Sequence, residues 1–178
     1  MKKLICFCGL PGVGKSTISQ RVRDRLGATV VNLDDFKRAD VDPSLVRTQI
    51  DPPELRWQYY REALGHALTL FAKGVRVIIL DEVFHLDSLR SRLEAIAMGH
   101  GVKVVWVEVL CSYEVVAKRL REKSREGHIL STDEALKMHL LFKSIFEKFP
   151  AEAKNHVVVT NESSDDVATA VGEVLKRC

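Results

Sequence analysis

The stretch that decides the fold is Gly9-Leu10-Pro11-Gly12-Val13-Gly14-Lys15-Ser16-Thr17. An apolar run at residues 4–8 precedes it, and a segment with helical spacing of its apolar side chains, residues 15–26, follows it. Glycines at these positions let successive backbone N–H groups converge on phosphate oxygens, and the start of the following helix adds partial positive charge at the same place. The pattern G-x-x-x-x-G-K-[ST], placed between a strand and a helix, therefore predicts a site for nucleotide phosphates.

Two side chains of this loop carry specific chemistry. The ammonium of Lys15 can reach the β- and γ-phosphates of a nucleoside triphosphate, and the hydroxyl of Ser16 can hold Mg²⁺. ATP and Mg²⁺ are therefore the expected cofactors. The loop residues expected to contact the nucleotide are Leu10, Gly12, Val13, Gly14, Lys15, Ser16 and Thr17.

Short apolar runs alternate with helical patterns along the rest of the chain. The expected strands are residues 4–8, 29–33, 76–80, 103–110 and 156–160, and the expected helices are 15–26, 54–73, 86–97, 113–121, 132–149 and 164–176. In the polar segment 34–52, the apolar residues have neither the spacing of a strand nor that of a helix. This order predicts βαβ units and a parallel sheet covered on both faces, because the strands are almost continuously apolar. Thr132 and Ser164 are the expected N-caps of the last two helices.

The composition bounds the class of protein. The chain has 178 residues, 46% of them hydrophobic and 29% charged, with a net charge of +3. One domain spanning residues 1–178 is expected, and the mild positive charge permits an anionic substrate without indicating a nucleic-acid-coating protein. No apolar run is long enough for a membrane span or a signal peptide, so we expect a cytoplasmic protein, with a monomer as the favoured state.

Acidic residues follow two of the expected strands. In open α/β sheets, ligands bind beyond the carboxyl ends of the strands. Strand 29–33 should therefore bring Asp34 or Asp35 toward the γ-phosphate, where a carboxylate can accept the proton of an attacking hydroxyl. Strand 76–80 ends at Asp81, whose carboxylate is expected to support Mg²⁺ together with Ser16.

The loop, with these acids, resembles the P-loop nucleoside triphosphatases and, among them, the small P-loop kinases of the polynucleotide-kinase-like and zeta-toxin-like group. The resemblance implies a three-layer αβα fold with a five-stranded parallel sheet in the order 2-3-1-4-5 and a helical lid at about residues 121–133. It also implies that Asp34, in Asn32-Leu33-Asp34-Asp35, is the catalytic base, and that Lys37 or Arg38 holds a substrate phosphate.

The resemblance also assigns residues near the lid. Residues 118–125 contain five basic side chains. The kinases resembled here place a first arginine against adenine, a position matched by Arg119, and a second basic residue on the transferring phosphoryl group, matched by Arg125 or Lys123. The loop after the fifth strand, with Asn161, is where the edge of the base is expected to rest.

The expected activity is transfer of the γ-phosphoryl group of ATP to a hydroxyl, either the 5′-hydroxyl of a nucleic acid or a small-molecule alcohol. The alternative is an ATP-binding switch that hydrolyses ATP slowly. The segment 34–61 is expected to house the acceptor. Within it, Trp57 and Tyr60 fall on the apolar stripe of helix 54–73, whereas Tyr59 lies off that stripe. We expect His85, a lone loop histidine, to be solvated rather than catalytic.

Overall fold

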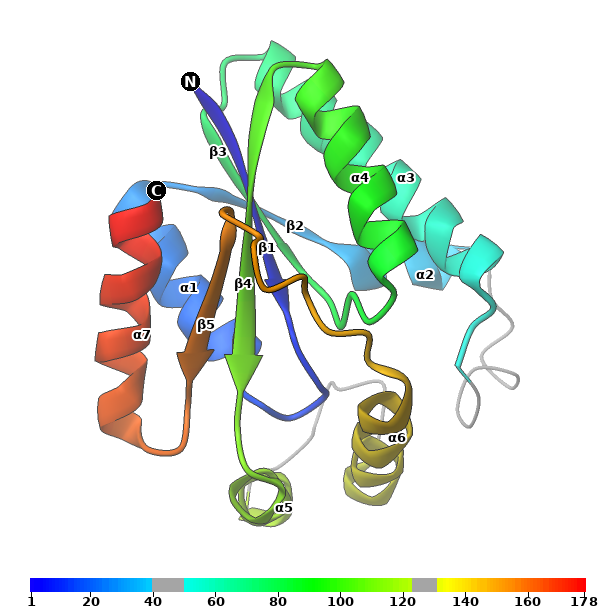
Figure 1. Ribbon diagram of the computed structural model, residues 1–178, viewed down its shortest axis with the longest axis vertical. Coiled ribbons are helices and arrows are strands. Elements are labelled where there is room, and N and C mark those ends of the chain that lie inside the picture. Colours follow the sequence, from blue (N-terminus) through cyan, green and yellow to red (C-terminus); the bar gives the residue numbers. More distant parts are fainter. Residues whose placement is uncertain (40–49, 123–130) are drawn as a thin grey trace.

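A twisted sheet of five parallel strands forms the centre of the protein. The computed structural model describes residues 1–39, 50–122 and 131–178 (Figure 1). Its strand order is β2-β3-β1-β4-β5, which confirms the expected order and direction. The strands are β1 (Lys2–Cys8), β2 (Thr29–Asn32), β3 (Val77–Asp81), β4 (Val102–Leu110) and β5 (His156–Thr160).

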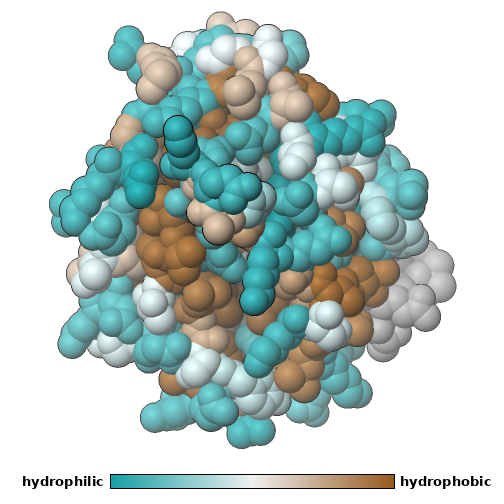
Figure 2. Space-filling view, in the orientation of Figure 1, coloured by the Kyte–Doolittle hydropathy of each residue, from teal (hydrophilic) through white to brown (hydrophobic). Residues whose placement is uncertain are grey.

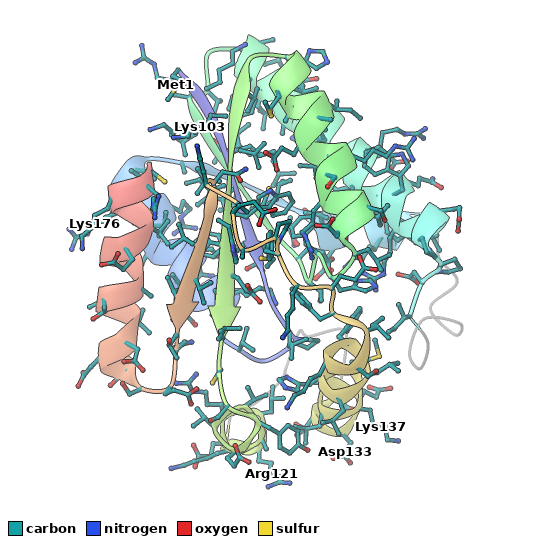
Figure 3. All side chains as sticks on the ribbon, viewed as in Figure 1. Met1, Lys103, Arg121, Asp133, Lys137 and Lys176 are labelled. Carbon is teal, nitrogen blue, oxygen red and sulfur yellow. The ribbon has the colours of Figure 1, made fainter. Side chains whose placement is uncertain are left out.

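Helices cover both faces of the sheet and complete the expected three layers (Figure 1). One face carries α1 (Lys15–Leu26) and α7 (Ser164–Arg177), and the other carries α3 (Pro53–Ala72) and α4 (Asp87–Gly99). The remaining helices are α2 (Leu33–Ala39), α5 (Tyr113–Glu122) and α6 (Thr132–Ile145). Figure 3 shows Arg121 of α5 and Lys137 of α6 at the end of the molecule opposite Met1, beyond the carboxyl ends of the strands.

The apolar side chains alternate between two cores because a strand points successive residues to opposite faces. In β1, Leu4, Cys6 and Cys8 face the α3–α4 core, whereas Ile5 and Phe7 face the core under α1 and α7. All five are completely buried. The face of the molecule in Figure 2 is correspondingly mostly hydrophilic, with separate apolar patches.

The segment after β2 differs from the expected strand and loop. Strand β2 ends at Asn32, and Leu33 is instead the first, fully buried residue of helix α2. The Asn32 side-chain oxygen accepts a hydrogen bond from the Asp34 backbone N–H at 3.1 Å, which ends the strand with a local turn. Asp34 and Asp35 lie in the first helical turn, where carboxylates favour helix formation. Residues 40–49 lie outside the described residues.

Two helix starts are displaced by one residue from their expected positions. Ser131 and Ser163, not Thr132 and Ser164, are the N-caps of α6 and α7, and each forms a capping box with an acid three residues later. Helix α6 ends at Ile145, earlier than the expected residue 149. Residues 123–130 lie outside the described residues, so the lid at 121–133 stays a prediction.

Candidate functional site

The loop between β1 and α1 has a backbone that only glycine can provide at two close approaches. Gly9 has a φ of +133°, and a Cβ there would lie 2.5 Å from the carbonyl oxygen of Val109. Gly14 has a φ of +89°, and a Cβ there would lie 2.2 Å from Nδ2 of Asn161. Residues other than glycine rarely adopt these positive φ values. The spacing of glycines therefore follows from how the loop folds against β4 and the β5–α7 connection.

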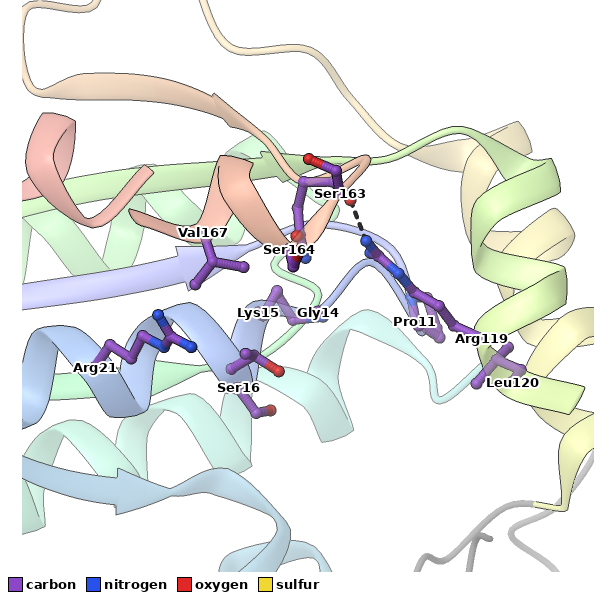
Figure 4. Close-up of a pocket in the computed structure, with 13 residues that line it drawn as sticks. Pro11, Gly14, Lys15, Ser16, Arg21, Arg119, Leu120, Ser163, Ser164 and Val167 are labelled. Carbon is purple, nitrogen blue, oxygen red and sulfur yellow. Dashed lines mark hydrogen bonds between the residues drawn. The ribbon is translucent and has the colours of Figure 1, made fainter. Parts of the chain in front are cut away.

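Lys15 lies at the N-terminus of α1 with its ammonium turned back on the loop. Its Nζ donates hydrogen bonds to the carbonyl oxygens of Gly9, at 2.9 Å, and Leu10, at 3.2 Å. A pocket of roughly 570 Å³ opens beside it. Its walls come from the loop and α1, from α5 and from the β5–α7 connection, including Gly12, Gly14, Lys15, Ser16, Thr17, Arg119 and Asn161 (Figure 4).

Two predicted residues from distant parts of the chain meet at this pocket. Asn161 is buried, and its Nδ2 donates to the Val13 carbonyl oxygen at 2.8 Å. Arg119 of α5 donates from Nη1 to the Asn161 backbone carbonyl at 2.7 Å, as the dashed line in Figure 4 shows. The structure thus joins three segments that sequence reasoning assigned separately to the nucleotide: the loop, α5 and the residue after β5.

Ser16 and Asp81, the predicted metal ligands, are in direct contact. The Ser16 hydroxyl donates to Asp81 Oδ2 at 2.8 Å, and the Ser19 hydroxyl lies 3.4 Å from the same oxygen. Burial raises the pKa of the Asp81 carboxyl, although the ammonium of Lys15 and the Ser16 hydrogen bond oppose this effect. An acid in such surroundings gains stabilisation from a nearby cation.

Asp34 lies in α2, just beyond the carboxyl end of β2, and it belongs to a chain of charged side chains. Its Oδ1 is 3.2 Å from Nζ of Lys37, and Lys37 also forms an ion pair with Glu82, the residue after β3. The far side of Glu82 faces Arg56 of α3, with 3.8 Å between Oε1 and Nη1. Glu82 therefore links α2, α3 and the β3–α4 connection, a role that its sequence position beside Asp81 did not reveal.

The charges in this chain determine one another's protonation. Burial alone would raise the pKa of the Glu82 carboxyl, but Lys37 and Arg56 outweigh it and lower the pKa to about 2. Burial alone would lower the pKa of the Lys37 ammonium, but Glu82 and Asp34 reverse the effect and raise it. Both partners are therefore ionised at neutral pH.

One expectation about exposure on the acceptor side is wrong. His85 is buried rather than solvated, because α6 packs Phe142 against its ring with 5.0 Å between centroids. Tyr59, which lies off the apolar stripe, is nevertheless as buried as Tyr60, and both belong with Trp57 to one core cluster. Burial, followed by the positive charge of Arg56, lowers the pKa of His85 to about 4.

A contact that the sequence did not indicate joins α6 to the phosphate loop. Nδ1 of His139 lies 2.8 Å from the carbonyl oxygen of Pro11. A carbonyl can only accept, so Nδ1 carries the proton. Burial lowers the pKa of His139, which keeps the ring neutral at pH 7. No spacing rule relates residues 11 and 139, and only the fold shows the pair.

The predicted residues thus form two groups. The pocket brings together the rest of the predicted loop residues with Arg119 and Asn161, but Leu10 and the buried Val13 do not line it, and Ser16 reaches Asp81 at the end of β3. Asp34 does not line this pocket but belongs to the charged chain beside it. Asp35 is exposed on α2. Lys123, Arg125 and the side chain of Arg38 lie outside the described residues.

Two features are absent from the part of the chain that the structure describes. Within residues 1–39, 50–122 and 131–178, no helix has the length and apolar character needed to cross a membrane. The same part of the chain contains no group of three or more His, Cys, Asp or Glu side chains placed to hold a metal ion by themselves.

Comparison with known proteins gives a family match and a set of similar folds. A family model described as an AAA domain (AAA_33) matches residues 4–143. No curated protein matches the chain. A gluconokinase from Sinorhizobium meliloti 1021 has 20% identity and a TM-score of 0.69, covering 98% of this chain and 90% of its own.

Two further solved structures have the same fold. A sugar kinase from Janibacter sp. HTCC2649 has 18% identity and a TM-score of 0.74, covering 99% of this chain and 94% of its own. The APS kinase of Mycobacterium tuberculosis, in complex with AMPPNP and APS, has 19% identity and a TM-score of 0.65, covering 99% of this chain and 96% of its own. At these identities the likeness concerns the fold.

Proposed function

Because the chain belongs to the AAA domain family AAA_33 of small P-loop kinases, we propose that it transfers the γ-phosphoryl group of ATP to a hydroxyl group of a small molecule. The observation that carries this proposal is the convergence of a phosphate loop with two carboxylates at one edge of the sheet. Asn32 and Asp81 are paired neighbours in the register of β2 and β3, and Asp34 follows two residues after Asn32. A nucleotide switch needs no second carboxylate there, whereas a kinase needs one to orient its acceptor.

The nucleotide half of the site follows from the loop. The backbone N–H groups of residues 12–15 cradle the phosphates, and the Lys15 ammonium moves from the loop carbonyls to the phosphate oxygens. Arg119 and Asn161 also line the pocket, and they are the proposed contacts to the base. Arg125, or Lys123 in its place, closes on the transferring group from the lid. Its charge stabilises the negative charge that develops there.

The residues present fit Mg²⁺. Mg²⁺ in nucleotide sites uses one or two protein oxygens and completes its shell with phosphate oxygens and water. Ser16 and Asp81 offer such a pair of oxygens, and the burial that raises the pKa of Asp81 is offset when a cation is bound. When bound, the ion neutralises charge on the β- and γ-phosphates.

Asp34 is the proposed catalytic base. Its carboxylate accepts the proton of the acceptor hydroxyl as the oxygen attacks the γ-phosphorus, and the bond to the β-γ bridging oxygen breaks. Lys37 restrains Asp34 through their 3.2 Å contact. Enclosure by the lid excludes water, which would otherwise compete with the acceptor.

A small-molecule acceptor is favoured over a nucleic acid by two findings. The polar side chains around Asp34 include Arg56, Glu82 and His85, which are buried rather than spread along an open surface. Two of the structures with this fold are named as a gluconokinase and a sugar kinase.

The experiment measures label transfer from γ-labelled ATP with Mg²⁺ to a pool of small alcohols and to a 5′-hydroxyl oligonucleotide. We expect label in the small-alcohol pool, abolished by Lys15→Ala. Asp34→Asn should lower transfer by several orders of magnitude with ATP affinity unchanged, while Asp35→Asn, the adjacent exposed acid, should leave transfer near the wild-type rate.

Each other result has a clear meaning. Full transfer by the Asp34→Asn protein would show that another group is the base. Label on the oligonucleotide alone would replace the small-molecule acceptor with a nucleic acid. Slow phosphate release with no labelled acceptor would favour the ATP-binding switch.

A further inference from the structure

Arg56 presents buried charged donors that lack a hydrogen-bond acceptor. Its side chain, in the first turns of α3, is only 5% exposed. Among the described residues, neither Nε nor Nη1 has a hydrogen-bond partner. The nearest carboxylates, on Glu82 and Asp51, are 3.8 and 3.9 Å from the guanidinium nitrogens, which is too long for hydrogen bonds. A guanidinium stays charged at every accessible pH, so burial without an acceptor is costly.

The Glu82 carboxylate beside Arg56 is already committed to other partners. Oε2 of Glu82 pairs with Lys37, and its Oε1 accepts the backbone N–H of Val83 at 2.8 Å. Lys37 in turn is shared between Glu82 and Asp34. The side chain of Asp51 is partly exposed, at 28%. Among the described residues, Nε and Nη1 of Arg56 are therefore left without an acceptor.

His85 gives a second, independent observation at the same place. It is 2% exposed, and its Nδ1 has no hydrogen-bond partner among the described residues. Both side chains pack against Phe142, whose ring centroid lies 5.0 Å from that of the His85 ring and 4.9 Å from Cζ of Arg56. Two buried polar side chains with nitrogen atoms that lack a hydrogen-bond partner thus share one apolar wall.

The backbone around His85 is rigidly held. Phe84 has a φ of +49°, the only positive φ of a non-glycine residue in the described ranges, and its carbonyl accepts a hydrogen bond from Arg90 at 2.8 Å. The His85 carbonyl accepts the backbone N–H of Glu147 at 2.9 Å. Strained backbone that neighbouring groups enforce is common where a ligand is bound.

We propose that Arg56, with His85 beside it, anchors an oxyanion of the acceptor, so that the phosphorylated alcohol also carries a carboxylate or a phosphate group. This inference rests on the proposed function and names the substrate class of the same site. A guanidinium fork binds both kinds of group through paired, charge-assisted hydrogen bonds. The neutral imidazole of His85 supplies one further hydrogen bond.

The test compares acceptors that differ only in charge. D-gluconate is paired with D-glucitol, and glycerol 3-phosphate with glycerol, in a coupled assay of ADP release. Wild type, Arg56→Met, Arg56→Lys and Arg61→Met are compared, the last because Arg61 is an exposed arginine on the same helix. We expect wild type to prefer the anionic member of at least one pair, by about 10- to 100-fold in kcat/KM.

Arg56→Met should erase that preference while leaving the KM for ATP unchanged, and Arg61→Met should preserve it. Arg56→Lys keeps the charge without the fork, so it should retain part of the preference and serve if Arg56→Met does not fold. A general structural defect would instead lower turnover of both members equally. The carboxylate and phosphate pairs distinguish which oxyanion is recognised.

Two outcomes overturn the inference. One is equal use of neutral and anionic members by wild type, which would leave the kinase proposal intact. The other is turnover of no member together with no saturable binding of D-gluconate or glycerol 3-phosphate in calorimetry with Mg²⁺ and a non-hydrolysable ATP analogue. Binding that depends on Arg56 without any phosphoryl transfer would support the anchor and contradict the kinase.

Discussion

The close approach of Gly14 to Asn161 predicts how much stability one substitution in the phosphate loop costs. In Gly14→Ala the new Cβ would lie 2.2 Å from Asn161 Nδ2, and the backbone would keep a φ of +89°. The positive φ costs an alanine about 1–2 kcal/mol. Asn161 is buried and bonded to the Val13 carbonyl at 2.8 Å, so moving it aside loses that bond and strands a buried acceptor, which costs a further 1–3 kcal/mol or so. We expect a total loss of about 2–5 kcal/mol.

Unfolding in urea gives the free energies, and calorimetry gives the affinity for an ATP analogue. Gly27→Ala is the matched control, because Gly27 also has a positive φ, of +60°, but a Cβ there meets nothing within 4 Å. That control should lose only about 1–2 kcal/mol of stability and keep wild-type nucleotide affinity. Gly14→Ala should lose nucleotide affinity as well.

The double variant isolates the part of the stability loss that comes from the clash between the new Cβ and Asn161. In an Asn161→Ala background the obstructing amide is absent, so Gly14→Ala should cost no more than Gly27→Ala does. The difference between the two backgrounds is the coupling energy between the residues. An equal cost of Gly14→Ala in both backgrounds would refute the reasoning, since the clash would then contribute nothing.

Three other predictions follow from the same contacts. Ser16→Ala should raise the Mg²⁺ concentration needed for half-maximal activity without altering the fold measured by circular dichroism, and an unchanged Mg²⁺ dependence would remove Ser16 from the metal site. The pKa of Glu82 is lowered to about 2, so its ionisation stabilises the fold above about pH 4.5, and this contribution is lost as the pH falls toward 2. Glu82→Gln should therefore be less stable than wild type at pH 7, and its free energy of unfolding should change less with pH between about 4.5 and 2. His139→Phe, which removes the hydrogen bond to the Pro11 carbonyl, should weaken ATP binding about fivefold, whereas His139→Asn, which keeps a donor, should weaken it less; equal affinities would contradict a role for the bond.

The sheet and the nucleotide half of the site could be predicted from sequence because their signals are local. The glycines, Lys15 and Ser16 lie within eight consecutive residues at the β1–α1 junction, and the acid that meets Ser16 directly ends the apolar run of β3. The spacing of apolar residues in a strand, followed by the spacing typical of a helix, identifies such a strand–loop–helix unit without information from distant residues.

The acceptor half could not be read in the same way, because its members come from four separate segments. Lys37, Arg56, Glu82 and His85 take their environments from one another and from Phe142, which approaches from α6. His85 illustrates the limit: a histidine in a loop is exposed unless another element covers it, and nothing near residue 85 indicates that α6 does so. Helix α2 was missed for a related reason, since its polar residues gain their helical preference from the turn at Asn32.

Both halves of the site are connected through α6, and this has a consequence for catalysis. His139 on α6 holds the Pro11 carbonyl of the phosphate loop, and Phe142, three residues later, forms the wall shared by Arg56 and His85. The two side chains lie about one helical turn apart, so a rigid shift of α6 moves both contacts together. A shift of α6 on nucleotide binding would therefore reposition the phosphate loop and the acceptor wall in one motion. On this view, ATP and the acceptor should bind with positive coupling, and His139→Phe should weaken the coupling more than it weakens either affinity alone.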